Sequence, residues 1–341
     1  MSAVPWLGFA QATVSALSSH ASRADYMRVE ETGSNTIRLE IAIREFRPSR
    51  GQGPVVWLSA VTHLGETNYY RQLQKHLDEQ ELVLYEGVEA ETDAGGRPTR
   101  FSPSPPRSAD ADAEAPTAEP GPGLQATMAA SLGLAFQLAA IDYSRPHFRH
   151  SDLSLDQIAT LTRGTRATQG GDSGPGDNLQ MLLEVMNGDS MAGALAAFAT
   201  RLLGSSPKLR AFTRLMLIET IGRLDGDLTQ AEGLPRDLRR LIEVLLAARN
   251  EAVVNDLKQW LARKEPPRSI SLFYGAAHMP DLEKRLVRQL NYRLVGERWL
   301  AALTVDVRQA GLTPAEIQLA RSTVQWQLDV LNGSRSGRRQ P

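Results

Sequence analysis

Two segments far apart in this chain share one design: an apolar run leads to a histidine, and an amphipathic helical pattern follows at once. The first run, Val55–Val61, is followed by His63, and the second, Ser269–Gly275, is followed by His278. Short continuous apolar runs of this kind are typical of strands buried on both faces, as in parallel sheets. The carboxyl ends of parallel strands share one edge, where open α/β sheets bind their ligands. The repeated design therefore predicts an α/β fold that can bring both histidines to one site.

The segments around the first histidine predict a hairpin followed by a βαβ unit. Runs over residues 26–32 and 36–46 flank a Gly-Ser-Asn turn, and the second run alternates apolar with polar or charged residues, which is typical of a hairpin with one buried face. After the first apolar strand we expect a helix over residues 65–79 and a short strand over residues 82–85 that ends at Glu86.

The second histidine lies in a similar series of elements. A helix over residues 280–290, a strand over residues 292–303 and a closing helix follow it. The closing helix has a start signal of its own, because Thr313 and Glu316 form a capping box with proline at the first helical position. We expect a mixed central sheet with flanking helices and two strand-histidine-helix halves.

Composition divides the chain between these halves. Residues 92–123 are rich in Pro, Gly, Ala, Ser and Asp and hold almost no large apolar residue, so we predict a disordered insert between an N-terminal half, 1–91, and the remainder. Helical patterns dominate residues 124–263, which we interpret as a large helical insertion. Residues 264–333 then form the C-terminal half, and residues 334–341 a disordered tail.

Charge and composition exclude several classes of function. The chain has 38 basic and 39 acidic residues, a formal net charge of -1, so it lacks the basic surface that nucleic-acid binding requires. It has no cysteine, which leaves its six histidines as the main metal ligands. The first 24 residues have no basic n-region, and no run of 18 apolar residues occurs. We therefore expect no membrane span, and a cytoplasmic location is favoured.

Glu86 adds a carboxylate to the two histidines, because it too directly follows a strand-like run. Two nitrogen ligands and one oxygen ligand with an open position are what a catalytic divalent metal needs, so His63, Glu86 and His278 are the candidate metal site. Glu66 lies at the start of the helix after His63, as a fourth ligand, a general base or a favourable charge at the helix N-terminus. The plainer interpretation is hydrogen-bonded loop histidines and surface carboxylates.

Arg249 lies on the otherwise apolar stripe of the last helix of the helical insertion. A guanidinium in that position needs a carboxylate or another acceptor, because an unpaired buried charge is very costly. Two interpretations remain open: Arg249 belongs to the site, or it only ties the helix to the sheet through a buried ion pair.

The order of these motifs is that of a known family. The second motif is a complete G-x-x-H in residues 275–278, Arg249-Asn250 forms an Arg-Asn pair late in a helical segment, and Leu84-Tyr85-Glu86 ends a strand with glutamate. The chain thereby resembles the TraB/TIKI/GumN family, which is similar to the ChaN and erythromycin-esterase-like proteins. The first motif departs from the pattern, because residues 60–63 read Ala-Val-Thr-His with alanine in place of glycine. The resemblance covers residues 55–86 and 249–303.

The resemblance implies a metal-dependent hydrolase of the metalloprotease type. His63, Glu86 and His278 then become metal ligands or catalytic groups, Arg249 pairs a carboxylate or the substrate, and Glu66 is a candidate proton acceptor. The implied metal is Mn or Co, with Zn as a further candidate, and the substrate is a peptide or small molecule. The alternative is a non-catalytic binding or regulatory protein on the same fold that sequesters a peptide or a heme or iron cofactor. The oligomeric state, including a homodimer, stays open.

A weaker group of candidate ligands occurs in the middle of the chain. His147, His150 and Asp152 have suitable side chains, but they follow an Arg-Pro pair that indicates a loop or the entry to a helix. Ser151 or Asp152 can cap that helix, so the role of this group stays open.

Overall fold

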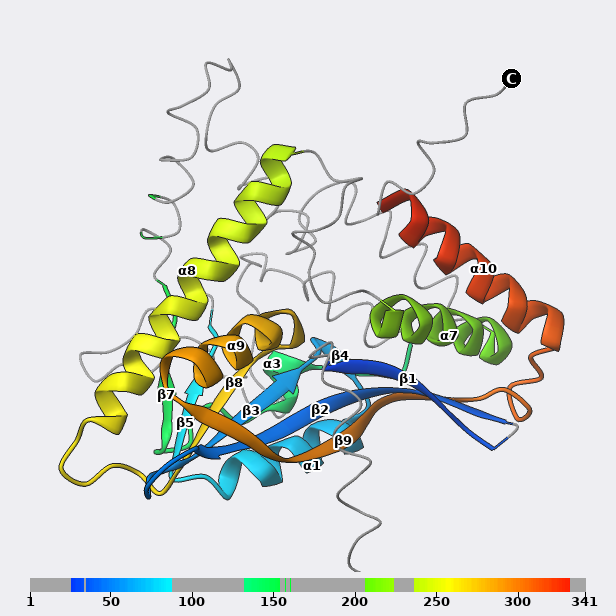
Figure 1. The fold of residues 1–341 in the computed structure, drawn as a ribbon. Helices are drawn as coiled ribbons and strands as arrows, with labels where there is room; N and C mark the ends of the chain where they lie inside the picture. Colours follow the sequence, from blue (N-terminus) through cyan, green and yellow to red (C-terminus); the bar gives the residue numbers. More distant parts are fainter. Residues whose placement is uncertain are drawn as a thin grey trace, which may run out of the picture.

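The computed structural model describes residues 26–33, 35–87, 132–153, 157, 160, 206–223 and 236–331. Within these ranges a mixed sheet of seven strands has the order β1-β2-β3-β8-β5-β7, and β9 pairs with β2 (Figure 1). The strands are β1 (Met27–Thr32), β2 (Thr36–Pro48), β3 (Val55–Val61), β5 (Leu82–Tyr85), β7 (Phe148–His150), β8 (Ser269–Gly275) and β9 (Tyr292–Asp306).

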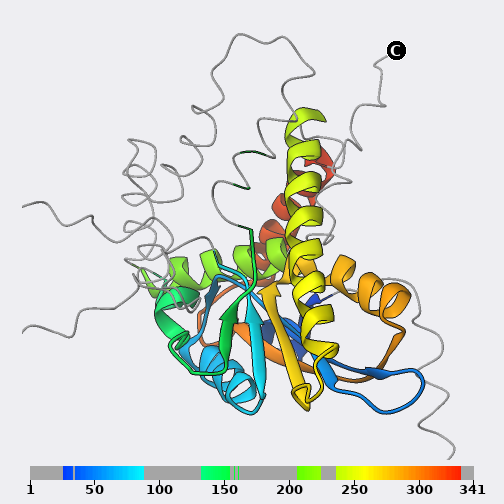
Figure 2. The same ribbon diagram turned by 90° about the vertical axis from the view of Figure 1, so that its left-hand side faces the viewer.

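Half of the sheet is parallel. Strand β8 lies between β3 and β5 and runs parallel to both, while β5 pairs in parallel with β7. In this register Val61 lies opposite Gly275, and Tyr85 lies opposite Phe273 and His150. Figure 2 shows these strands side by side, with α8 rising along them. The carboxyl ends of all four strands therefore share one edge.

The other half is antiparallel and is organised around the long strand β2. Strand β9 pairs with β2 from Thr36 to Pro48, so β1 and β3 share the opposite edge of β2. The early part of β2 alternates buried with half-buried side chains, whereas its middle is buried throughout because helices cover both faces there.

Helices cover the sheet on both faces (Figure 1). On one face lies α1, which buries Tyr69, Tyr70, Leu73 and Leu77, and on the other lies α9, against which α8 packs. Farther along the sheet, α7 packs on β1 and β2, and α10 packs on α7. The helices and short elements are α1 (Thr67–Asp78), α3 (Gln137–Ala140), α7 (Pro207–Arg223), α8 (Arg236–Leu261), α9 (Met279–Gln289), α10 (Pro314–Leu331), η2 (Ala276–His278), β4 (Leu64–Gly65) and β6 (Ala135–Phe136).

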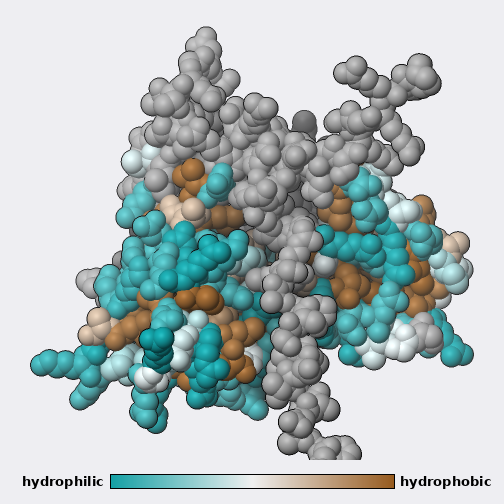
Figure 3. Space-filling view, viewed as in Figure 1, coloured by the Kyte–Doolittle hydropathy of each residue, from teal (hydrophilic) through white to brown (hydrophobic). Residues whose placement is uncertain are grey.

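Helix α10 begins at the predicted capping box and leaves one apolar side exposed. The amide of Thr313 donates to Glu316 Oε2 at 2.8 Å, and the amide of Glu316 donates to Thr313 Oγ1 at 3.3 Å. Leu319, Trp326 and Val330 are exposed at helical spacing. Figure 3 shows hydrophobic residues among hydrophilic ones over this part of the surface.

The fold class predicted from the sequence is confirmed: a mixed sheet with flanking helices, with strands at 55–61 and 269–275. Residues 124–263, predicted to be a mainly helical insertion, also contain two short strands that were not predicted, because Phe148–His150 forms the edge strand β7 and Ala135–Phe136 pairs with β4. Such short strands have no periodic pattern of their own and exist because their backbone groups pair with neighbours. The predicted insert at 92–123 and tail at 334–341 lie outside the described residues.

None of the helices in the described ranges is both long and apolar enough to cross a membrane.

Candidate active site

The shared carboxyl edge carries the residues that the sequence singled out. His63 follows β3, Glu86 follows β5 directly, and His278 ends the short helix η2 after β8. The neighbouring strand β7 adds Asp152 to the same edge. The sheet order β3-β8-β5-β7 thus turns four separate strand ends into one row of polar side chains.

Arg249 of α8 binds two carboxylates at this edge. Its Nη2 lies 2.7 Å from Glu86 Oε1 and 2.6 Å from Asp152 Oδ2, and its Nε donates to Asp152 Oδ1 at 2.9 Å. The Asp152 side chain is only 1% exposed, so the guanidinium compensates a carboxylate that water cannot reach. The prediction that Arg249 pairs a carboxylate is confirmed, and the pairing also ties α8 to the sheet.

Glu86 is held as a carboxylate by several donors. Its Oε2 accepts the amide proton of Gly275 at 2.7 Å. Burial alone would raise the pKa of Glu86, but His278, Arg249 and the Gly275 amide outweigh burial and hold the pKa well below its usual range. Glu86 therefore carries its negative charge throughout the neutral pH range.

The ring of His278 is oriented by a chain of hydrogen bonds. Asn250 Nδ2 donates to Asp281 Oδ2 at 2.9 Å, which fixes the orientation of the amide and leaves Asn250 Oδ1 as an acceptor. His278 Nδ1 lies 2.7 Å from that oxygen and therefore carries a proton. The other ring nitrogen, Nε2, faces Glu86 Oε1 at 3.4 Å. Asn250 thus presents Nε2 of a buried imidazole to a buried carboxylate.

The spacing of this pair agrees with part of a metal site. A direct charge-assisted hydrogen bond between nitrogen and oxygen is about 2.7–2.9 Å long, shorter than the 3.4 Å between His278 Nε2 and Glu86 Oε1. By contrast, two ligand atoms that each bind a tetrahedral metal ion at about 2.1 Å lie about 3.4 Å from one another. A metal-bound histidine also donates its second ring N–H to a fixed acceptor, as His278 does to Asn250. These two residues therefore fit two positions of a coordination sphere.

His63 has a similar anchor but lies apart from that pair. Its Nδ1 is 3.0 Å from Gln137 Oε1, and Gln137 Nε2 donates to the hydroxyl of Tyr143 at 2.9 Å. Gln137 thus orients the His63 ring, as Asn250 orients His278. In the described part of the chain, no three His, Asp or Glu side chains are grouped closely enough to hold a metal ion. The structure does not bring His63 into one ligand group with Glu86 and His278.

The remaining candidates have their contacts elsewhere. Glu66 Oε1 accepts the amide proton of Thr304 on β9 at 2.9 Å and lies 3.8 Å from Arg214 of α7, so its carboxylate ties β9 and α7 to the start of α1. His147 Nε2 lies 3.2 Å from the carbonyl of Leu77, at the opposite end of β7.

His150 lies near the edge, but its Nε2 is 3.0 Å from the Gly87 carbonyl, so a backbone group occupies that nitrogen. The side chains of His147 and His150, two of the weaker candidates, are thus bonded to backbone carbonyls. The third, Asp152, belongs to the group of Glu86, Arg249 and Asp152 at the sheet edge.

The contacts of four residues at or near this edge do not follow from the sequence. Asp152 is a candidate ligand or helix cap from the sequence, and its pairing with Arg249 is a tertiary contact without a local signal. Asn250 follows Arg249 directly, so the Arg-Asn pair was a signal for it. Gln137 and Tyr143 lie in the predicted helical insertion, and no sequence signal marks them as residues of a site.

Comparison of the chain with protein-family models, curated proteins and solved structures gave no match in any of the three.

Proposed function

We propose that this chain is a metal-dependent hydrolase whose active site is the carboxyl edge of β3, β8 and β5. The observation that carries the proposal is the fixed pair of His278 Nε2 and Glu86 Oε1, 3.4 Å apart, with the second ring nitrogen of His278 held by Asn250. Polar side chains held in fixed orientations are typical of sites that bind or move charge, because they need not reorganise during the reaction.

In this proposal His278 and Glu86 hold a divalent cation, Mn or Co with Zn as a further candidate. When bound, the cation would supply a water of lowered pKa. Arg249 and Asp152 keep Glu86 in place, and Asn250 keeps Nε2 of His278 directed at the site. His63, whose Nδ1 is held by Gln137, would use its other ring nitrogen, Nε2, to accept a proton from the attacking water. The substrate is a peptide or a small ester-like molecule.

Metal analysis combined with His278→Ala tests this proposal. We expect the purified wild type to take up Mn, Co or Zn stoichiometrically, and the variant to lose the metal together with hydrolysis of a peptide and ester panel, by about 100-fold or more. His147→Ala is the matched control, because it removes a histidine at the opposite end of β7. Equal metal uptake by wild type and His278→Ala would show that the site is assigned wrongly.

A second candidate is a non-catalytic binding or regulatory protein that uses the same edge. One observation favours it: Glu86 Oε1, the oxygen that would bind the metal, already accepts a hydrogen bond from Arg249 at 2.7 Å. In that case the wild type takes up no metal and turns over no substrate, but still binds peptides in calorimetry.

A further inference from the structure

The hydroxyl of Tyr85 is buried without a hydrogen-bond partner. Tyr85 ends β5, directly before Glu86, and is 5% exposed. Its oxygen is inaccessible, and within the described ranges no donor or acceptor reaches it. Buried polar groups are almost always paired, because burial removes their bonds to water and an unpaired group is left without compensation. An exception beside a candidate active site points to a missing acceptor.

A second tyrosine, Tyr143, packs beside the ring of Tyr85. The rings of Tyr85 and Tyr143 are 5.1 Å apart, and Tyr143 also packs on Phe273 of β8. The Tyr143 oxygen accepts from Gln137 Nε2, whose amide is oriented by His63 on its other side. Since that oxygen is an acceptor in this bond, the Tyr143 proton is free, and no described residue accepts it.

Both phenols stay protonated at neutral pH. Burial raises the pKa of Tyr85 to about 12, against a small opposing effect of Arg149. Burial also raises the pKa of Tyr143, and the nearby charge of Glu86 raises it further. The two side chains are therefore hydrogen-bond donors without charge.

We propose that Tyr85 and Tyr143 form a subsite that donates hydrogen bonds to an uncharged oxygen acceptor, the carbonyl of an ester or amide substrate. The proposal rests on the hydrolase function above and adds the group that binds the reacting carbonyl. An uncharged acceptor is favoured because neither phenol carries a charge that would attract an anion. As water adds to the carbonyl carbon, negative charge grows on the carbonyl oxygen, and the two hydrogen bonds strengthen without any proton transfer.

Stability in the absence of ligand is the first test. Tyr85→Phe removes a buried hydroxyl that has no partner, so we expect the Tm to stay the same or to rise by roughly 2–4 °C. Tyr292→Phe is the matched control, because its hydroxyl donates to the Pro54 carbonyl at 3.1 Å, at the far end of the sheet. That variant should lower the Tm. A fall of the Tm in Tyr85→Phe as large as in Tyr292→Phe would overturn the proposal.

Binding and turnover give the second test. In saturation-transfer NMR we expect N-acetylalaninamide to bind the wild type and Tyr292→Phe, and binding to be lost in the Tyr85→Phe/Tyr143→Phe double variant. Hydrolysis by each single variant should fall on the order of 100-fold. Amide binding without hydrolysis in the wild type would leave the subsite intact and refute the hydrolase. Hydrolysis that neither substitution affects, or a wild type that does not bind the amide, would refute the subsite.

Discussion

Replacing Arg249 by methionine is expected to lower the free energy of unfolding by about 3–5 kcal/mol, because Glu86 and Asp152 would be left buried without their shared cation. Methionine keeps much of the apolar volume of the arginine stem, so the loss reports on charge rather than on packing. Denaturant unfolding at pH 7 measures the change. An Arg249→Met variant as stable as the wild type would contradict a buried, interdependent network.

The loss of stability caused by Arg249→Met should depend on pH. Because the pKa of Glu86 lies below its usual range in the folded wild type, its contribution to stability is present above pH 4.5 and is lost as the pH falls further. In Arg249→Met the unpaired carboxylates gain from protonation, so the difference between variant and wild type should shrink as the pH falls below about 5. Glu86→Gln in the Arg249→Met background should recover part of the loss at pH 7.

Arg268→Met is the matched control for this experiment. Arg268 also pairs with a carboxylate, that of Glu81, but its side chain is 91% exposed. An exposed pair contributes little, because water screens it and side-chain entropy opposes it. The contrast between the two arginines therefore isolates the effect of burial.

Much of the fold could be predicted because its central strands are determined by local pattern. The apolar runs of β3 and β8 have both faces buried and no competing helical period, so their bounds follow from composition. Strand β7 could not be predicted, because its three residues form a strand only through pairing with β5. The pairing of β8 between β3 and β5 joins segments from opposite ends of the chain, and no local pattern specifies it.

In the candidate site, the residues that follow strands could be predicted, but their partners could not. His63, Glu86 and His278 follow strands, and a parallel sheet places strand ends at one edge whatever the order of the strands. Their partners depend on contacts over long distances in the sequence: Arg249 and Asp152 are 97 positions apart, and His63 and Gln137 are 74 apart. Side-chain direction decides which of these groups meet, and the sequence does not encode that direction locally.

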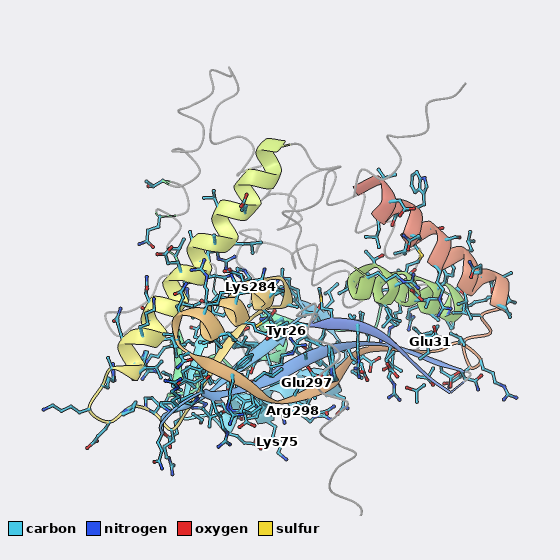
Figure 4. All side chains as sticks on the ribbon, viewed as in Figure 1. Tyr26, Glu31, Lys75, Lys284, Glu297 and Arg298 are labelled. Atoms are coloured by element: carbon cyan, nitrogen blue, oxygen red, sulfur yellow. The ribbon has the colours of Figure 1, made fainter. Side chains whose placement is uncertain are left out.

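A buried histidine outside the site should make the protein sensitive to mild acid. His76 of α1 is 2% exposed, and its Nε2 lies 3.0 Å from Ser59 Oγ, which itself accepts a hydrogen bond from Ser271. The Ser59 proton is thereby free to bond to a neutral imidazole. Burial lowers the pKa of His76 to about 3, and the cation of Arg298, on the α1 side of the sheet with Lys75 (Figure 4), adds to the effect.

The consequence is a loss of stability on the acid side of neutrality. In the unfolded chain His76 titrates near its ordinary value of about 6.5, so below that pH the unfolded state binds a proton that the folded state does not accept. Stability is fully present above pH 6.5 and falls by as much as about 1.4 kcal/mol per pH unit below it, or about 3 kcal/mol by pH 4. Denaturant unfolding between pH 7 and pH 4 measures this slope.

His76→Gln separates this titration from all others, because glutamine can still accept from Ser59 but takes up no proton. The variant should lose stability at pH 7 through imperfect packing against Trp57, whose ring meets that of His76 edge-on at 5.0 Å. As the pH falls, its stability should decline less steeply than that of the wild type, and the two curves should converge or cross near pH 4. Parallel curves would mean that His76 is protonated in the folded protein, and that the hydroxyl chain of Ser59 and Ser271 does not hold the ring neutral.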